Sequence, residues 1–267
     1  MLVDYDFLSL DMIPLSEDIK LALSSPRELI VLPGEKNNWN ETTTIGRGER
    51  RSISLDIRVG AGARGEMVRI FEVPQGAKLT ILHNVNVEAG GVWRNVICVR
   101  GAGEVNIRRA LNLSGAQSEA VLVCLGVMEQ TGRISVADEI FSLAPKTKAL
   151  LRTKIVLNQA ARSEVRGRMV VSEASTASES FERLDHLVFG DQASAAAIPE
   201  LEVNTDEVKC GHGATTSRPG ENELFYLTSR GLSLAAAQRL VARGFIAEAL
   251  VDLPESVQQE VVEVLFG

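Results

Sequence analysis

The sequence of 267 residues predicts a mainly β protein, a parallel β-helix with a small C-terminal helical subdomain. Short runs of alternating apolar residues recur across residues 45–213, with glycines between them about every 11 to 15 residues. Tight hairpin turns such as Asn-Gly are scarce, which favours the corners of a β-helix over the hairpins of a β-sandwich, although the strand pattern alone fits both. From residue 214 onwards the apolar spacing becomes helical.

Residues 1–44 are interpreted as a mixed lead-in to the β block. Residues 16–24 have the spacing of a short helix, residues 29–32 form an apolar run, and the polar segment 37–44 is typical of a linker. The first twenty residues are acidic and contain no long apolar stretch. They therefore predict neither a signal peptide nor a membrane span.

Residues 45–213 form the β block. In its first clear run, Ile53, Leu55 and Ile57 face one way while Ser54 and Asp56 face the other, as in a half-buried strand. Comparable runs follow at 79–87, 105–113, 120–127, 134–136, 150–157, 165–171 and 187–189.

Residues 214–267 form the predicted helical subdomain. Helical spacing appears in three segments, at 223–229, 233–243 and 254–266. Ser233 is a typical N-cap, and Gly231 and Gly244 stand where helices would end.

A glycine-rich segment at 60–65 matches the letters of the dinucleotide-binding fingerprint. That site needs a helix directly after the glycines, so that the helix N-terminus can receive the pyrophosphate. Residues 66–73 instead have the pattern of a strand that ends at Pro74. A glycine-rich corner is therefore the expected structure.

Charge and cysteine content restrict the class of protein. A net charge of −7 argues against a nucleic-acid-binding protein, because phosphate contacts need a basic surface. Three widely spaced cysteines without a secretory start predict no disulfide framework and indicate the cytoplasm.

An alternative function is that of a β-helix enzyme that cleaves polysaccharides with paired carboxylates. Its candidates, Asp56, Asp138 and Asp185, lie in separate runs, and aromatic residues for sugar stacking make up 4% of the chain.

The segment Cys210-Gly-His212-Gly is the strongest candidate metal site. Thiolate and imidazole side chains suit zinc or iron, including iron–sulfur clusters, and the flanking glycines would let the backbone bend towards an ion. One such pair is half of a closed four-ligand site. His83, Cys98 and Cys124 lie within apolar runs and are expected to pack in the core.

Residues 200–218 (ELEVNTDEVKCGHGATTSR) resemble the signature of the SufB/SufD family. The resemblance continues through residues 223–231 (ELFYLTSRG) and 243–248 (RGFIAE), in the order found in the family. The match is close over residues 181–253, and residues 45–180 fit the β-helix body of the family more loosely.

This resemblance implies a right-handed parallel β-helix that acts as a scaffold for iron–sulfur cluster assembly and is not an enzyme. It also implies that two such subunits pair through their β-helices, that a transient cluster is built near the paired surface from Cys210 and His212, and that no cofactor is bound tightly. It further implies that the C-terminal helices bind SufC, an ABC-type ATPase. The ATPase-contacting residues implied by the resemblance are Phe225, Tyr226, Arg230, Gly231, Arg243, Gly244, Phe245 and Glu248.

The sequence also departs from the family pattern. SufB-like members have a cysteine between the arginine and aspartate at 183–185, where this chain has Leu184, so the resemblance is stronger to SufD. In contrast, residues 214–218 resemble SufB. The resemblance leaves open a homodimer or a heterodimer, and a purely structural partner of SufC that binds no metal is a further alternative.

Overall fold

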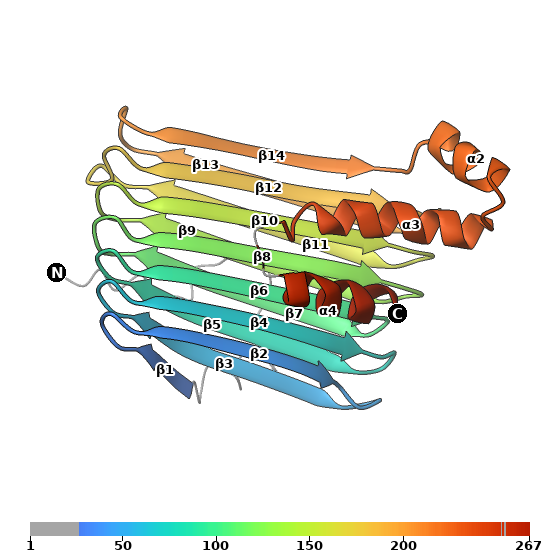
Figure 1. The fold of residues 1–267 in the computed structure, drawn as a ribbon, viewed down its shortest axis with the longest axis horizontal. Coiled ribbons are helices and arrows are strands. Elements are labelled where there is room, and N and C mark those ends of the chain that lie inside the picture. Colours follow the sequence, from blue (N-terminus) through green and yellow to red (C-terminus); the bar gives the residue numbers. More distant parts are fainter. Residues whose placement is uncertain (1–26, 252, 254) are drawn as a thin grey trace.

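The computed structural model describes residues 27–251, 253 and 255–267. The helix predicted at 16–24 lies outside the described residues. The described chain folds into two parallel sheets of seven strands each, with three helices after them (Figure 1).

Consecutive strands alternate between the two sheets. The odd sheet contains β1 (Arg27–Val31), β3 (Arg50–Val59), β5 (Lys78–Val87), β7 (Glu104–Leu113), β9 (Arg133–Ser142), β11 (Arg162–Val171) and β13 (Ser194–Val203). The even sheet contains β2 (Lys36–Thr44), β4 (Arg64–Val73), β6 (Val92–Gly101), β8 (Glu119–Met128), β10 (Lys148–Leu157), β12 (Glu179–Val188) and β14 (Lys209–Ser217). Each strand pairs in parallel with the strand two places along the chain, so two strands make one coil and the coils stack. This arrangement confirms the parallel β-helix and rejects the β-sandwich.

The main core fills the space between the two sheets. Inward residues such as Ile81, Ile107 and Leu122 are almost completely buried and stack from coil to coil. His83 and Cys124 lie in this interior, which confirms that they are packed core residues. Burial of His83 is the main reason that its pKa falls to about 3, so its ring stays neutral at physiological pH.

A second core lies between the outer face of the even sheet and the helices α3 (Leu234–Ala247) and α4 (Glu255–Phe266) (Figure 1). Cys98 points into this second core, which confirms its packing role. The shorter helix α2 (Glu221–Ser229) follows β14 and extends beyond the ends of the strands. The Ser233 side chain accepts a hydrogen bond from the Ala236 amide at 3.2 Å, as predicted for the N-cap of α3.

The strands extend further than the sequence pattern indicated. Residues 37–44, predicted as a linker, form most of β2, and β14 continues to Ser217 rather than ending near residue 213. Both are edge strands of the even sheet, so each hydrogen-bonds to one neighbour and keeps polar, exposed side chains. An exposed edge strand lacks the apolar alternation by which buried strands are recognised.

The glycine-rich segment at 60–65 forms the corner between β3 and β4. Gly62 has a φ of +65°, a left-handed conformation that suits glycine, and a strand follows directly. The expected corner is confirmed, and the helix that a dinucleotide site would need is replaced by β4.

Candidate functional site

Cys210 and His212 lie near the start of β14, the last strand of the even sheet (Figure 1). Their register partners on β12 are Ser180 and Glu182, whose side chains are buried on the inward side of the coil. Because side chains alternate along a strand, Cys210 and His212 share this inward side at the open end of the stack. The flanking glycines were expected to let the backbone bend towards an ion, whereas the segment is a regular strand paired with β12.

The glycines beside these two residues occupy the opposite face of β14. A side chain at Gly211 would touch the Phe181 ring at 3.4 Å, and one at Gly213 would lie 3.6 Å from the Arg183 guanidinium. Cys210 and His212 therefore face the inward side of the last coil, away from Phe181 and Arg183. Partial burial raises the pKa of the Cys210 thiol, opposed by a hydrogen bond with the Ser180 backbone, so metal binding would have to displace a proton from sulfur.

Glu182 lies one strand below His212 and is almost fully buried. Neither oxygen of its carboxyl group has a hydrogen-bond partner among the described residues. Burial, followed by the nearby charges of Asp138 and Glu200, raises its pKa to about 8. Gly167 on the opposite sheet faces this carboxyl group, and even a methyl group there would overlap it. The glycine therefore makes the room that Glu182 occupies.

A buried ion pair lies deeper in the coil. The Arg109 guanidinium binds both carboxylate oxygens of Asp138, at 2.7 and 2.6 Å, and also donates to the Asn95 side chain at 3.1 Å. Asp138 is therefore bound inside the β-helix. The other candidate carboxylates of a sugar-cleaving enzyme lie elsewhere, since Asp56 alternates outward on β3 and Asp185 binds Thr215 on the outer face of the even sheet. The paired acids of such an enzyme are not brought together.

Within the described ranges, no group of three or more His, Cys, Asp or Glu side chains is arranged to hold a metal ion. Cys210 and His212 thus offer one thiol and one imidazole on the same side of β14, half the number of ligands in a closed site. A closed site of four ligands would need further donors.

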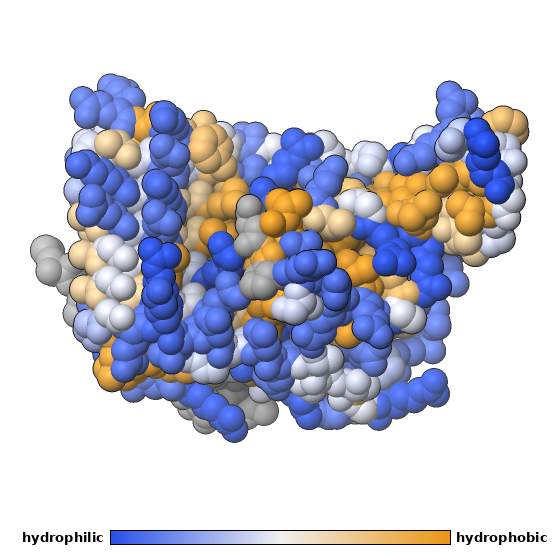
Figure 2. Space-filling model, in the orientation of Figure 1, coloured by the Kyte–Doolittle hydropathy of each residue, from blue (hydrophilic) through white to orange (hydrophobic). Residues whose placement is uncertain are grey.

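Exposed apolar side chains cluster on the helical subdomain. Phe225 and Tyr226 of α2 are 74% and 57% exposed, and Leu234 and Leu240 of α3 are also exposed. Figure 2 shows apolar side chains gathered over α2 and α3. A hollow of about 550 Å³ separates these two helices from the end of β14. Soluble monomers rarely leave such groups uncovered, so this surface is a candidate protein-binding site.

The predicted ATPase contacts divide between this surface and the sheet. Arg230 lies over the Tyr226 ring at 5.3 Å, and Gly231, with a φ of +94°, ends α2 as predicted. Gly244 does not end a helix, which corrects the prediction, because α3 continues past it to Ala247. The exposed position of Gly244 allows the helix to tolerate a glycine there.

Three other predicted contacts lie further along α3. Arg243 is exposed, whereas Phe245 is half-buried and Glu248 follows the last turn. The Phe245 ring and the Glu248 carboxylate both contact Lys154 on the sheet. These two residues therefore contribute to the packing of α3 against the even sheet.

Arg109, Glu182 and Lys154 were not predicted from the sequence. Arg109 and Glu182 each occupy an inward position of a strand, where apolar residues are expected. A charged residue at such a position was the sequence signal that could have identified them. Lys154 alternates outward on β10, and no local signal shows that a helix would cover it.

None of the described helices is long and apolar enough to cross a membrane. The family model for the SUF system FeS cluster assembly SufBD core domain matches residues 20–245. An iron–sulfur cluster assembly SufBD family protein of Mycobacterium tuberculosis is 30% identical over 227 residues, covering 76% of this chain and 57% of the relative. A second M. tuberculosis protein of that description is 34% identical over 116 residues, 43% of this chain and 14% of the relative.

A Synechocystis protein of the same description is 34% identical over 101 residues, 38% of this chain and 22% of the relative. The chain therefore spans 57% or less of the length of these three relatives. The family model, in contrast, covers most of the β-helix and extends into α3. On this match, together with the stacked parallel coils and the cysteine–histidine segment on β14, the chain belongs to the SufBD family of iron–sulfur cluster assembly proteins.

Proposed function

We propose that this chain is a scaffold subunit of a Suf-type complex, where it holds nascent iron and sulfide and does not catalyse a reaction of its own. The observation that carries the proposal is the placement of Cys210 and His212 on one side of an edge strand at the open end of the coil stack. Thiolate and imidazole are suitable ligands for iron. The cluster is cargo in this proposal, assembled and then passed on. Three free cysteines suit a reducing compartment such as the cytoplasm.

Pairing of two subunits would complete the site. Among the described strands β14 pairs only with β12, so the backbone amides and carbonyls of its other edge can add a strand from another SufB/SufD-type subunit. Two copies would supply two thiolates and two imidazoles, the number of ligands in a closed site. A homodimer is thus sufficient, and a heterodimer would need ligands from the other subunit.

The α2–α3 surface is proposed to bind an ABC-type ATPase of the SufC kind. Tyr226 lines the hollow and Phe225, its neighbour on α2, is largely exposed, and aromatic residues are enriched at the centres of protein interfaces. Co-expression with the ATPase from the same genomic neighbourhood, followed by native mass spectrometry, would report the complex and its stoichiometry. Phe225→Ala should weaken the complex, whereas Ile30→Ala, an exposed apolar residue on β1, should leave it intact.

Anaerobic reconstitution with ferrous iron and sulfide tests the cargo site. Cys210→Ala and His212→Ala should each reduce bound iron and sulfide and the associated visible absorbance. Cys98→Ala removes a thiol that is buried beneath the helices and should retain the wild-type iron content. Circular dichroism of each variant controls for folding. Wild-type iron and sulfide binding in both β14 variants would refute the ligand assignment. A wild-type protein that binds no iron would instead favour the purely structural SufC-binding subunit, the alternative that also fits Leu184 in place of the SufB-like cysteine.

A further inference from the structure

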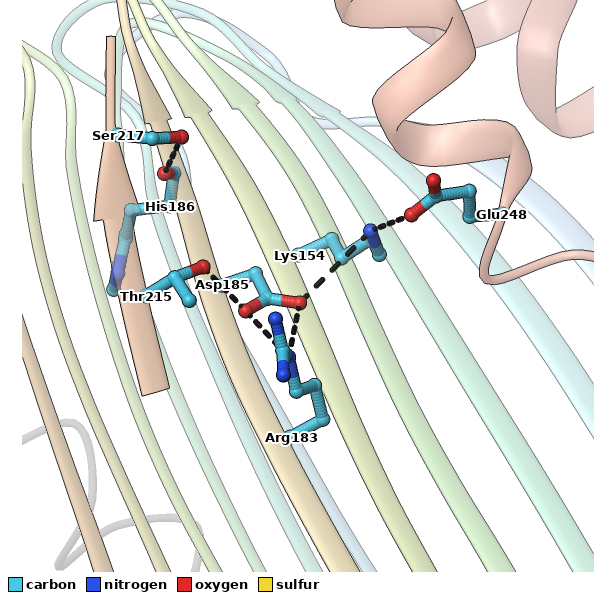
Figure 3. A network of polar contacts seen from close by, with 7 residues as sticks. All are labelled: Lys154, Arg183, Asp185, His186, Thr215, Ser217 and Glu248. Carbon is cyan, nitrogen blue, oxygen red and sulfur yellow. Dashed lines mark hydrogen bonds and ion pairs between the residues drawn. The ribbon is translucent and has the colours of Figure 1, made fainter. Parts of the chain in front are cut away.

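Three side chains form a column on the outer face of the even sheet (Figure 3). Lys154 on β10, Asp185 on β12 and Thr215 on β14 are register partners, so they lie one strand apart from each other. The Thr215 hydroxyl donates a hydrogen bond to an Asp185 carboxylate oxygen at 2.6 Å, and the Lys154 ammonium lies 3.9 Å from the other oxygen. The Arg183 guanidinium also donates to both oxygens, at 2.8 and 3.0 Å. Asp185 therefore binds the terminal strand.

Lys154 connects this column to α3. Its ammonium donates to the Glu248 carboxylate at 2.6 Å and lies 4.2 Å from the centroid of the Phe245 ring. The side chains of Lys154 and Asp185 are 6% and 5% exposed, so their charges are screened little by solvent. The contacts with Glu248 and Phe245 hold the ammonium group at the position from which it reaches Asp185. An unbroken line of polar contacts thus runs from the end of α3 to β14.

Strand β14 has few other anchors. It hydrogen-bonds to β12 on one side, and most of its side chains are exposed. Lys209 contacts Glu179 at 3.3 Å at the surface, and Ser217 donates to the His186 carbonyl at 3.4 Å. The contact between Thr215 and Asp185 is shorter than either and involves a buried charge. A change at Asp185 should therefore alter how firmly β14 is held.

We propose that Lys154 and Asp185 are positioning residues that couple the end of α3 to β14, and through it to Cys210 and His212. A partner that displaces Phe245 or Glu248 would free the Lys154 ammonium and weaken the hold of Asp185 on Thr215. The functional consequence rests on the proposed function, because the displacing partner is the docked ATPase and the affected side chains are the cluster ligands. The coupling itself is a property of the isolated chain.

Replacement of Lys154 by methionine tests the coupling in the full chain without metal or partner. Methionine keeps an apolar stem against Phe245 but removes the charge. Cys210 is partly exposed whereas Cys98 and Cys124 are buried, so the fast phase of alkylation by iodoacetamide reports on β14. We expect Lys154→Met to increase this rate, and hydrogen exchange in β14, by about tenfold. Lys154→Arg restores the charge and should recover most of the protection.

Lys148→Met is the matched control. Lys148 lies on the same strand and contacts Glu119 at 3.5 Å, with 60% of its side chain exposed. Its replacement should leave the Cys210 alkylation rate unchanged. Equal rates in Lys154→Met and Lys148→Met would overturn the proposal, and so would a failure of Lys154→Arg to restore protection.

A double-mutant cycle between the two ends of the line provides a second test. Glu248→Gln and Thr215→Val should each accelerate Cys210 alkylation, and the double variant should be slower than the product of the two effects predicts. Multiplicative effects would show independent sites and refute the coupling. Because these measurements use neither iron nor the ATPase, the coupling can hold when reconstitution fails, and reconstitution can succeed when the coupling fails.

Discussion

Replacement of Asp138 by asparagine would test the ion pair inside the β-helix. The side chains of Arg109 and Asp138 are 0% and 1% exposed, and two hydrogen bonds of 2.7 and 2.6 Å join them. Asparagine has nearly the same shape but no charge, so the guanidinium would remain buried without an anion. Breaking a buried pair in this way costs about 3–5 kcal/mol. That loss is a large part of a typical free energy of unfolding of about 5–15 kcal/mol.

Urea unfolding followed by circular dichroism would measure the change in the free energy of unfolding. The corresponding decrease in the thermal midpoint is roughly 6 to 20 °C, at about 2–4 °C per kcal/mol for a chain of this size. The double variant Arg109→Met with Asp138→Leu is the control, because it removes both charges and should lose less stability than Asp138→Asn alone. A loss below about 1 kcal/mol for Asp138→Asn, or a double variant less stable than the single, would refute this account.

Three further predictions concern single groups. The folded-state pKa of Glu182, about 8, lies above its ordinary value of 4.5, so the free energy of unfolding should fall as pH rises between these values. Urea unfolding at about pH 5 and pH 8 would measure this decline. Glu182→Gln should remove it. The folded-state pKa of His83, about 3, lies below its ordinary value of 6.5, so the free energy of unfolding should fall as pH drops through this range. NMR should find a neutral His83 ring at about pH 5. A charged ring at that pH would contradict the burial of His83. Ser233→Ala should cost about 1 kcal/mol and speed hydrogen exchange in the first turn of α3; exchange unchanged from wild type would show that the cap contributes nothing.

The interior strands of the fold could be predicted because each buries one apolar face. Runs such as that of β5 alternate clearly, and their glycine corners mark the ends. The edge strands could not be predicted in this way, since β2 and β14 each pair with a single strand within residues 27–251 and keep polar side chains. The conformation at two glycines was also ambiguous in the sequence. Gly211 fits a bend or a strand, and it lies in β14. Gly244 fits the end or the interior of a helix, and it lies inside α3.

The candidate site was predictable only where it depends on local spacing. Two residues that are two apart on a strand share a face, so Cys210 and His212 remain neighbours in a strand as well as in a turn. The partners of Lys154 depend instead on contacts over long separations, such as the 94 residues between it and Glu248. Such contacts follow from the register of stacked coils and the docking of α3, neither of which has a local signature in the sequence.

The stacked coils also give this molecule a fixed unit of length. Each coil adds one strand to each sheet, and neighbouring strands lie about 4.8 Å apart. Gain or loss of a whole coil would therefore change the height of the stack in steps of that size and leave the local chemistry of β14 unaltered. Duplication of complete coils offers evolution a simple way to adjust the span between the two ends, whereas insertion of one residue within a strand would turn the inward side chains that follow it in that strand to the outside.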